Sequence, residues 1–132
     1  MADAPIVVRR IMQIALVVHD TRRAIAFYRD LLGLTLLFEA PPAMAFFDCG
    51  GVRLMLSPPS SPDVDHPASI LYYDVADVRV AHAALSARGV QFRTPPHLVH
   101  RAATHELWMA FLADPDGNVL ALVSELPLHT GG

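Results

Sequence analysis

The feature of this sequence that most limits its possible folds is an internal repeat, in which both halves carry the same order of elements. Residues 13–20 form a short apolar run that ends in an aspartate, and residues 70–77 form another. Each run is followed by a segment whose apolar residues recur at helical spacing and which ends at a glycine, Gly33 or Gly89. We therefore expect each half to begin with a β-strand and an α-helix, with the aspartate as the helix N-cap.

Three further strand candidates follow each helix. In the first half they are residues 34–38, 44–48 and 52–57, and in the second half they are residues 90–93, 106–112 and 118–124. A ferredoxin-like plait has only one strand after the helix of each repeat, so the surplus strands argue against it. The sequence therefore predicts an α+β fold made of two βαβββ modules.

The domain organisation follows from this repeat. At 132 residues the chain has the length of one domain, and we expect a single domain over residues 1–132. Module one spans about residues 11–57, and module two about residues 69–125. Residues 58–68, rich in Pro, Ser and Asp, are expected to be a solvated linker, and residues 127–132 a flexible tail.

Three segments together resemble the vicinal-oxygen-chelate superfamily, which includes glyoxalase I, bleomycin-resistance proteins and extradiol dioxygenases. The resemblance covers roughly residues 11–125 and is carried by the order and spacing of these segments: the first strand and helix with Phe27-Tyr28 and Leu32-Gly33, then Val75-Ala76-Asp77, then Asp114-Pro115-Asp116-Gly117-Asn118.

This resemblance implies that the two βαβββ modules form a curved mixed sheet around a cleft. The paired modules come either from one chain or from two subunits in such proteins, and the sequence leaves both arrangements open. The resemblance also implies a homodimer.

Metal-using members of the superfamily place one ligand on the first strand and one on the last strand of each module. Transferred to this sequence, these positions fall on Gln13, Met55, Ile70 and Ala121, with Ser69 replacing Ile70 if the register slips by one. Apolar side chains do not bind a divalent cation, and Gln13 alone supplies too few donor atoms. We therefore predict no cofactor, and a divalent metal is the disfavoured alternative.

Residues 97–108 concentrate polar side chains in a segment that reads as a loop leading into a strand. One interpretation is a solvated polar loop. A second is a ligand-binding lip, in which basic or acidic groups contact a polar or anionic part of the ligand and an indole supplies a flat apolar surface. The candidates for this lip are His97, His100, Arg101, Glu106 and Trp108.

A third interpretation of the same segment is a displaced metal site that uses His97, His100 and His105. If the protein is an enzyme without metal, the candidates for general acid–base catalysis are His100, Glu106 and His19. Whether Glu106 faces the cleft depends on strand parity, which the sequence leaves open.

Composition limits the classes of partner. The formal charge is −3, and the basic residues are spread along the chain, so neither nucleic acid nor a membrane surface is an expected partner. One cysteine rules out an intrachain disulfide, and we expect a cytoplasmic protein. Hydrophobic residues make up 53% of the chain, which fits an apolar cleft or a dimer interface in addition to the core.

The predicted function is therefore the binding of a small, largely apolar or aromatic molecule, as in bleomycin-resistance-type proteins, with the usual metal site degenerate. The alternative is a lyase, isomerase or dioxygenase of the same fold, working with a relocated metal or with none, so enzymatic activity is left open. The residues expected to line the cleft, besides the lip above, are Gln13, Met55, Tyr72 and Ala121.

Overall fold

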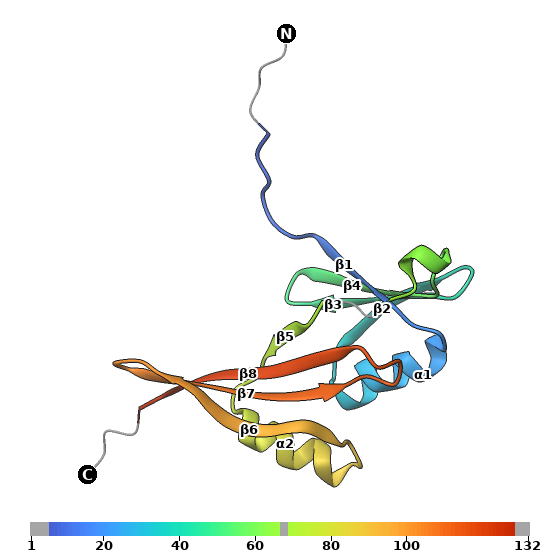
Figure 1. The fold of residues 1–132 in the computed structure, drawn as a ribbon. Coiled ribbons are helices and arrows are strands. Elements are labelled where there is room, and N and C mark those ends of the chain that lie inside the picture. The colour runs from blue at the N-terminus through green and yellow to red at the C-terminus, as the bar shows by residue number, and fades with distance from the viewer. Residues whose placement is uncertain (1–5, 67–68, 129–132) are drawn as a thin grey trace.

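The computed structural model describes residues 6–66 and 69–128, and it confirms the predicted order of elements (Figure 1). Module one contains β1 (Gln13–Val17), α1 (Thr21–Ile25), η1 (Ala26–Leu31), β2 (Thr35–Ala40), β3 (Met44–Cys49) and β4 (Val52–Ser57). Module two contains β5 (Leu71–Asp74), α2 (Val78–Ala87), β6 (Phe92–Arg101), β7 (His105–Ala113) and β8 (Val119–Pro127).

The two modules form two mixed four-stranded sheets with the same topology. Their strand orders are β1-β4-β3-β2 and β5-β8-β7-β6. In each sheet the first and last strands of the module pair in parallel, and the other neighbours pair antiparallel. The α+β fold of two βαβββ modules is therefore as predicted.

Both helices begin where the sequence places an aspartate. The Asp20 carboxylate accepts a hydrogen bond from the Arg23 amide at 3.1 Å, and the Asp77 carboxylate accepts one from the Arg79 amide at 2.9 Å. These bonds satisfy amides that have no partner within the first turn of a helix. The first helix is π-helical over its last six residues, η1, which the sequence pattern does not reveal.

One face of each sheet packs into a core that the two modules share. In β4, for example, Leu54 and Leu56 are buried while Arg53 and Met55 lie on the other side of the strand, as the two-residue period of a strand requires. The same core cluster contains Leu120 and Leu122 of β8 together with residues of both helices. The helix-bearing faces of both sheets therefore pack together, and the opposite face of each sheet is left open.

A turn of module two is fixed to module one by one buried and one partly buried hydrogen bond. The Tyr28 hydroxyl of η1 donates to the Asp114 carboxylate at 2.7 Å, and the Asn118 side-chain amide donates to the Val17 carbonyl at 3.1 Å. Asp114 also accepts from the Asp116 and Asn118 amides, both at 2.9 Å. The Asp-Pro-Asp-Gly-Asn turn therefore closes the β7–β8 hairpin and also joins the two modules.

The linker contains a short 3₁₀ helix, η2 (Pro62–Val64). β8 extends to Pro127, two residues beyond the expected end of module two, and the tail expected over residues 127–132 otherwise falls largely outside the described residues. None of the helices in the described part of the chain is long and apolar enough to cross a membrane.

Candidate functional site

The open face of the first sheet carries a polar group bounded by apolar side chains. The Arg53 guanidinium donates to the Gln13 side-chain oxygen at 2.7 Å, and the Gln13 amide nitrogen lies 3.8 Å from the Met55 sulfur. Arg53 also lies over the Phe46 ring, 5.6 Å from its centroid, and Phe46 stacks on Phe38 at 4.4 Å. We call these five residues the first open face.

The open face of the second sheet is also aromatic. The Tyr72 ring of β5 packs edge-to-face against the Phe111 ring, with 6.0 Å between the ring centroids. The His97 ring stacks on Phe111 at 6.3 Å. Ala121 pairs with both Tyr72 and Phe111 in the sheet, and its small side chain is fully covered. We call the second open face Tyr72, His97, Met109, Phe111 and Ala121.

A recess with two carboxylates adjoins the second open face. It has a volume of about 540 Å³ and is lined by Tyr72 and Met109 together with Asp74 and Glu125. Both carboxylates are exposed, and neither forms an ion pair within the described residues. This end of the face is therefore negatively charged as well as apolar.

The four positions to which the resemblance assigns metal ligands occupy equivalent places in the two sheets. Met55 pairs with Ala15, two residues after Gln13, and Ala121 pairs with Tyr72, two residues after Ile70. The only oxygen donor among the four side chains, that of Gln13, already accepts from a guanidinium, whose positive charge repels a second cation. These residues do not fit the usual metal of the family.

The histidine-rich segment is a β-hairpin, which corrects the expectation of a loop leading into a strand. His97 and His100 lie in β6 and His105 begins β7. The His97 ring nitrogen Nδ1 lies 3.0 Å from the Pro95 carbonyl, and that of His105 lies 2.8 Å from the Thr104 hydroxyl. Within residues 6–66 and 69–128 no three His, Cys, Asp or Glu side chains are grouped to hold a metal. The displaced histidine site therefore has no support in this geometry.

Three of the residues expected at a ligand-binding lip lie on the other face of the sheet. Glu106 accepts hydrogen bonds from the Trp108 indole at 3.1 Å and from Arg101 at 2.7 Å, and the Arg79 guanidinium of α2 lies over Trp108 at 5.5 Å. Strand parity explains the placement, because Trp108 has the same parity as the buried core residue Ala110. His97 and His100 lie opposite Met109 and Leu107, on the open side.

These contacts also decide the ionisation of Glu106. The hydrogen bonds from Trp108 and then from Arg101 hold the pKa of the Glu106 carboxyl below its usual value. A general base working near neutral pH needs a raised carboxyl pKa, so Glu106 is a structural anion in this arrangement. Its oxygens are already engaged by two donors.

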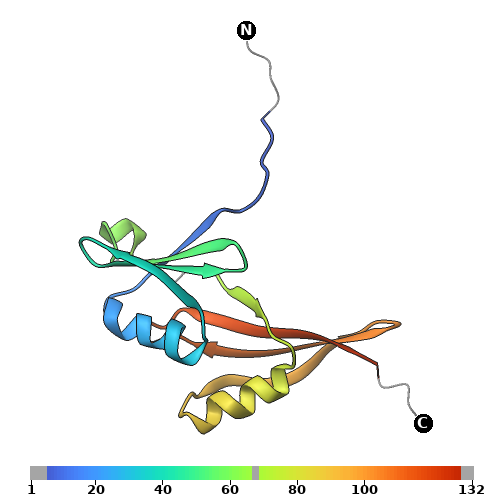
Figure 2. The ribbon, with the colours of Figure 1, turned by 180° about the vertical axis from the view of Figure 1, so that it is seen from behind.

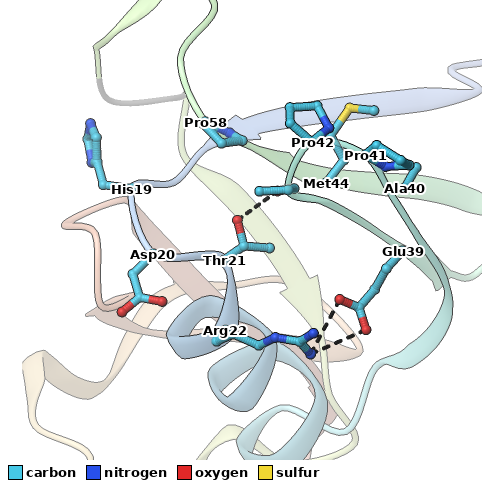
Figure 3. A pocket seen from close by; sticks show the side chains of 11 residues that line it. His19, Asp20, Thr21, Arg22, Glu39, Ala40, Pro41, Pro42, Met44 and Pro58 are labelled. Carbon is cyan, nitrogen blue, oxygen red and sulfur yellow. Dashed lines mark hydrogen bonds and ion pairs between the residues drawn. The ribbon is translucent and has the colours of Figure 1, made fainter.

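Another recess, with several charged side chains, lies at one end of the first sheet (Figure 3). It has a volume of about 690 Å³ and is walled by Pro41, Pro42 and Pro58 on one side. Across it, Arg22 and Glu39 face each other at 3.4 Å, as the dashed lines show. Its exposed Arg22 and Glu39 form an ion pair, and His19 and Asp20 also line it, so it suits an apolar ligand less well than the open faces do.

His19, a catalytic candidate, connects three parts of the chain at the rim of this recess. Its Nε2 lies 2.8 Å from the Asp65 carboxylate in the linker, and its Nδ1 lies 3.3 Å from the Asp116 carboxylate in the β7–β8 turn. The Asp65 hydrogen bond, followed by its charge and then by Asp116, raises the pKa of His19. His19 therefore connects the linker and module two to module one most strongly when it is protonated.

We predict that His19 stabilises the protein more in acid than in base. Because the folded pKa is raised above the unfolded value of about 6.5, the stabilisation is complete below that value and is lost as the pH rises through the folded pKa. The midpoint of thermal unfolding should therefore differ more between wild type and His19→Gln near pH 5 than near pH 9. Equal differences at both pH values would contradict this prediction.

A third cavity, of about 510 Å³, lies between the helices of the two modules. It is lined mainly by aliphatic side chains, including Leu32, Ala84 and Leu122, and by Cys49. Burial, followed by the charge of Asp48, raises the pKa of the Cys49 thiol, which favours its neutral form. This cavity competes with the open faces as a place for an apolar molecule, and the ligand experiment below separates the two.

Several residues of the open faces did not emerge from the sequence. Phe38, Phe46, Arg53 and Phe111 were not among the predicted site residues, although Phe38 and Phe111 contribute to the aromatic surface and Phe46 packs against Phe38 and Arg53. The available signal was the two-residue period of each strand: once Met55 is placed on the open side, its cross-strand partner Phe46 must lie beside it.

Comparison with known proteins agrees with this architecture. The family model of the Glyoxalase/Bleomycin resistance protein/Dioxygenase superfamily matches residues 10–122. A crystal structure of a superfamily member from Sphaerobacter thermophilus superposes with a TM-score of 0.75 at 24% identity, covering 89% of this chain and 98% of that one. Lactoylglutathione lyase from Agrobacterium tumefaciens superposes with a TM-score of 0.66 at 25% identity, covering 87% and 92%. The uncharacterized protein YraH of Bacillus subtilis is 26% identical over 133 residues, which cover 89% of this chain and 99% of that protein.

Proposed function

The chain belongs to the Glyoxalase/Bleomycin resistance protein/Dioxygenase superfamily, and from that premise we propose that it binds a small, largely apolar or aromatic molecule on its open sheet faces, without the usual metal of the family. The observation that carries this proposal is the exposed aromatic surface. Phe38 is 47% exposed although it stacks on Phe46, and Tyr72 is 53% exposed although it packs edge-to-face against Phe111. Exposed apolar patches of this kind are typical of binding sites.

The groups on these faces suit recognition of a flat ligand. Phe38 and Phe111 offer ring surfaces on which an aromatic molecule stacks, and the thioether of Met55 adapts to an irregular outline. The Gln13 amide and the Arg53 guanidinium supply a small number of polar contacts that would orient the ligand. Such a site gains affinity by removing apolar surface from water.

We propose that a second copy of the chain completes the site. Within one chain the helix-bearing faces share a core, so the two open faces lie on the outside of the molecule. A homodimer would cover the first open face of one copy with the second open face of the other. The ligand would then lie between residues of two subunits, shielded from water.

Sequestration accounts for these residues better than the alternative of catalysis by the same fold. Glu106 is held as a carboxylate by Trp108 and Arg101, and His19 is paired with two aspartates at the end of the sheet. His100 is exposed in the β6–β7 hairpin. These three candidates lie in different places, and acid–base catalysis requires groups that converge on one substrate.

Binding of a neutral aromatic dye tests this proposal. We expect Nile red to fluoresce on mixing with the protein, and Phe111→Ala to raise its dissociation constant about tenfold or more, because stacking and burial of one ring contribute about 1.4 kcal/mol or more. Val80→Ser, an exposed change on α2, is the matched control and should leave the dissociation constant unchanged.

Two further measurements test where the dye binds and whether the protein binds a metal. Ala84→Leu narrows the cavity between the helices, so weaker dye binding by this variant with no effect of Phe111→Ala would place the ligand there and contradict the proposal. Elemental analysis after incubation with Zn²⁺, Ni²⁺, Mn²⁺ or Fe²⁺ should find less than one metal per chain. A stoichiometric metal would overturn the metal-free part of the proposal.

A further inference from the structure

The cavity between the helices of the two modules lies where the C-terminal ends of η1 and α2 come close together, as both ribbon views show (Figures 1 and 2). Arg88, directly after α2, donates to the Asp30 backbone carbonyl of η1 at 2.9 Å and joins these two ends. The cavity has a volume of about 510 Å³. Pockets that hold small organic molecules in proteins have volumes of about 300–1,000 Å³, so this one is large enough for such a ligand.

Aliphatic side chains of both modules form most of its walls. The residues contributed by α2 and its C-cap recur three or four positions apart and so lie on one face of the helix: Ala81, Ala84, Leu85 and Arg88. From module one come Leu31 and Leu32, the last residue of the π-helical segment η1 and its C-cap. π-Helical turns are frequent at functional sites. These walls suit a flexible aliphatic chain.

The buried wall of the cavity carries no charge. Tyr73 packs against the shared core, and its hydroxyl is buried without a hydrogen-bond partner in the described part of the chain. Burial, followed by interaction with Cys49 and then with Asp114, raises the pKa of Tyr73, and the pKa of the Cys49 thiol is raised as well. Both groups are therefore neutral near pH 7, and this wall suits the apolar part of a ligand.

The rim, by contrast, carries an unpaired positive charge. Arg88 is exposed, and it forms no ion pair within residues 6–66 and 69–128. The nearby Asp30 carboxylate is paired with Arg29 at 2.8 Å. Asp74 also lines the cavity, but it has the same parity as Tyr72, so its carboxylate lies toward the open face. The polar group favoured at the rim is therefore an anion.

We propose that this cavity is a second binding site, which takes an aliphatic carboxylate: the carboxylate pairs with the Arg88 guanidinium, and the chain packs on the leucines and alanines between the helices. A guanidinium matches a carboxylate in charge and in shape, because it presents a planar fork of N–H donors. Packing of the chain removes its methylene groups from water. The site is separate from the aromatic open faces and does not depend on the function proposed for them.

Titration with sodium octanoate, followed by amide chemical shifts in two-dimensional NMR, tests this site. We expect saturable shifts that concentrate around Leu32, Ala84 and Arg88. Octanoate should bind more tightly than hexanoate, by up to about fourfold for each added methylene, because the longer chain buries more apolar surface.

Removal of the charge at the rim tests the carboxylate contact. Arg88→Gln should raise the dissociation constant of octanoate about fivefold and leave that of 1-octanol unchanged, because only the carboxylate pairs with the guanidinium. Arg88→Lys keeps the charge and should restore most of the affinity for octanoate. Arg93→Gln removes an exposed charge that does not line the cavity, and this matched control should have no effect.

The chain contact is tested by two alanines of α2. Ala84→Leu narrows the cavity and should raise the dissociation constants of octanoate and 1-octanol alike, each about fivefold or more. Ala83→Leu makes the same change at an exposed position that does not line the cavity, so it should alter neither. Far-ultraviolet circular dichroism checks the fold of each variant.

The outcomes separate this inference from the proposed function. The second site is overturned if wild type shows no saturable binding of octanoate, or if either Arg88→Gln or Ala84→Leu leaves that binding unchanged. Octanoate binding that Phe111→Ala weakens and Ala84→Leu does not would place the carboxylate on the open faces and also overturn it. Dye binding that Phe111→Ala leaves unchanged overturns the proposed function alone, provided that octanoate still responds to Arg88→Gln and Ala84→Leu.

Discussion

Replacement of Asp114 by alanine should lower the free energy of unfolding by about 3–4 kcal/mol, a large effect for a single residue. The Asp114 carboxylate accepts four hydrogen bonds, from the Tyr28 hydroxyl, the amides of Asp116 and Asn118, and the Asn118 side chain. Asp114 is 5% exposed and Tyr28 is 1% exposed, so water does not easily replace the lost acceptor. Denaturation by urea, followed by circular dichroism, measures the change.

Tyr28→Phe is the matched control for this prediction. It removes only the donor that reaches across the modules and leaves the hydrogen bonds within the turn, so we expect a loss of about 1 kcal/mol. If Asp114→Ala cost no more than Tyr28→Phe, the turn would not depend on this carboxylate. The double variant should lose less than the sum of the two single changes, because both remove the same hydrogen bond.

This junction shows what local sequence signals do and do not predict. Asp-Pro-Asp-Gly predicts a turn between two strands, and Gly117 adopts the left-handed backbone, with φ of 84°, that such a turn requires. The sequence does not indicate that Asp114 meets Tyr28, 86 positions earlier in the chain. The repeat predicts the elements, whereas the contact between modules depends on how they pack.

The histidine-rich segment shows a second limit of sequence-based prediction: in an irregular strand, the sequence does not indicate which sheet face each side chain occupies. The pairing of β6 with β7 has register shifts after Phe92, Thr94 and Leu98, and each shift changes which residues face the same side. Polar residues with no regular alternation therefore read as a loop. Regular β4, by contrast, was predicted with its observed bounds of Val52–Ser57, because its residues alternate between the core and the open face.

The repeat allowed the equivalence of positions in the two sheets to be predicted. The positions of Gln13 and Met55 in the first sheet correspond to those of Ile70 and Ala121 in the second, and the two parallel ladders have this equivalence. The aromatic residues around them belong to strands whose facing side is fixed only by the pairing, so two adjacent rings such as Phe46 and Phe47 cannot be separated by sequence alone. They lie on opposite faces of β3.

The same alteration on the two faces of the first sheet should therefore destabilise the protein to different extents. Phe47 is fully buried, and its ring centroid lies 6.2 Å from that of Tyr28, so Phe47→Ala should lower the free energy of unfolding by about 3–5 kcal/mol. Phe38→Ala removes a half-exposed ring that stacks on Phe46, and we expect a loss of about 0.5–1.5 kcal/mol. Urea denaturation compares the two variants directly.

Dye binding should rank the two variants in the reverse order. Phe38→Ala removes part of the first open face from a protein that is still folded, so Nile red should bind it about tenfold more weakly than wild type. Phe47→Ala should bind the dye normally in the fraction of molecules that is folded, because its side chain faces the core. If folded Phe47→Ala lost dye binding while Phe38→Ala bound the dye as wild type does, the ligand would lie on the helix side of the sheet. The two phenylalanines, nine residues apart on adjacent strands, would thus separate the side of this sheet that stabilises the fold from the side proposed to bind the ligand.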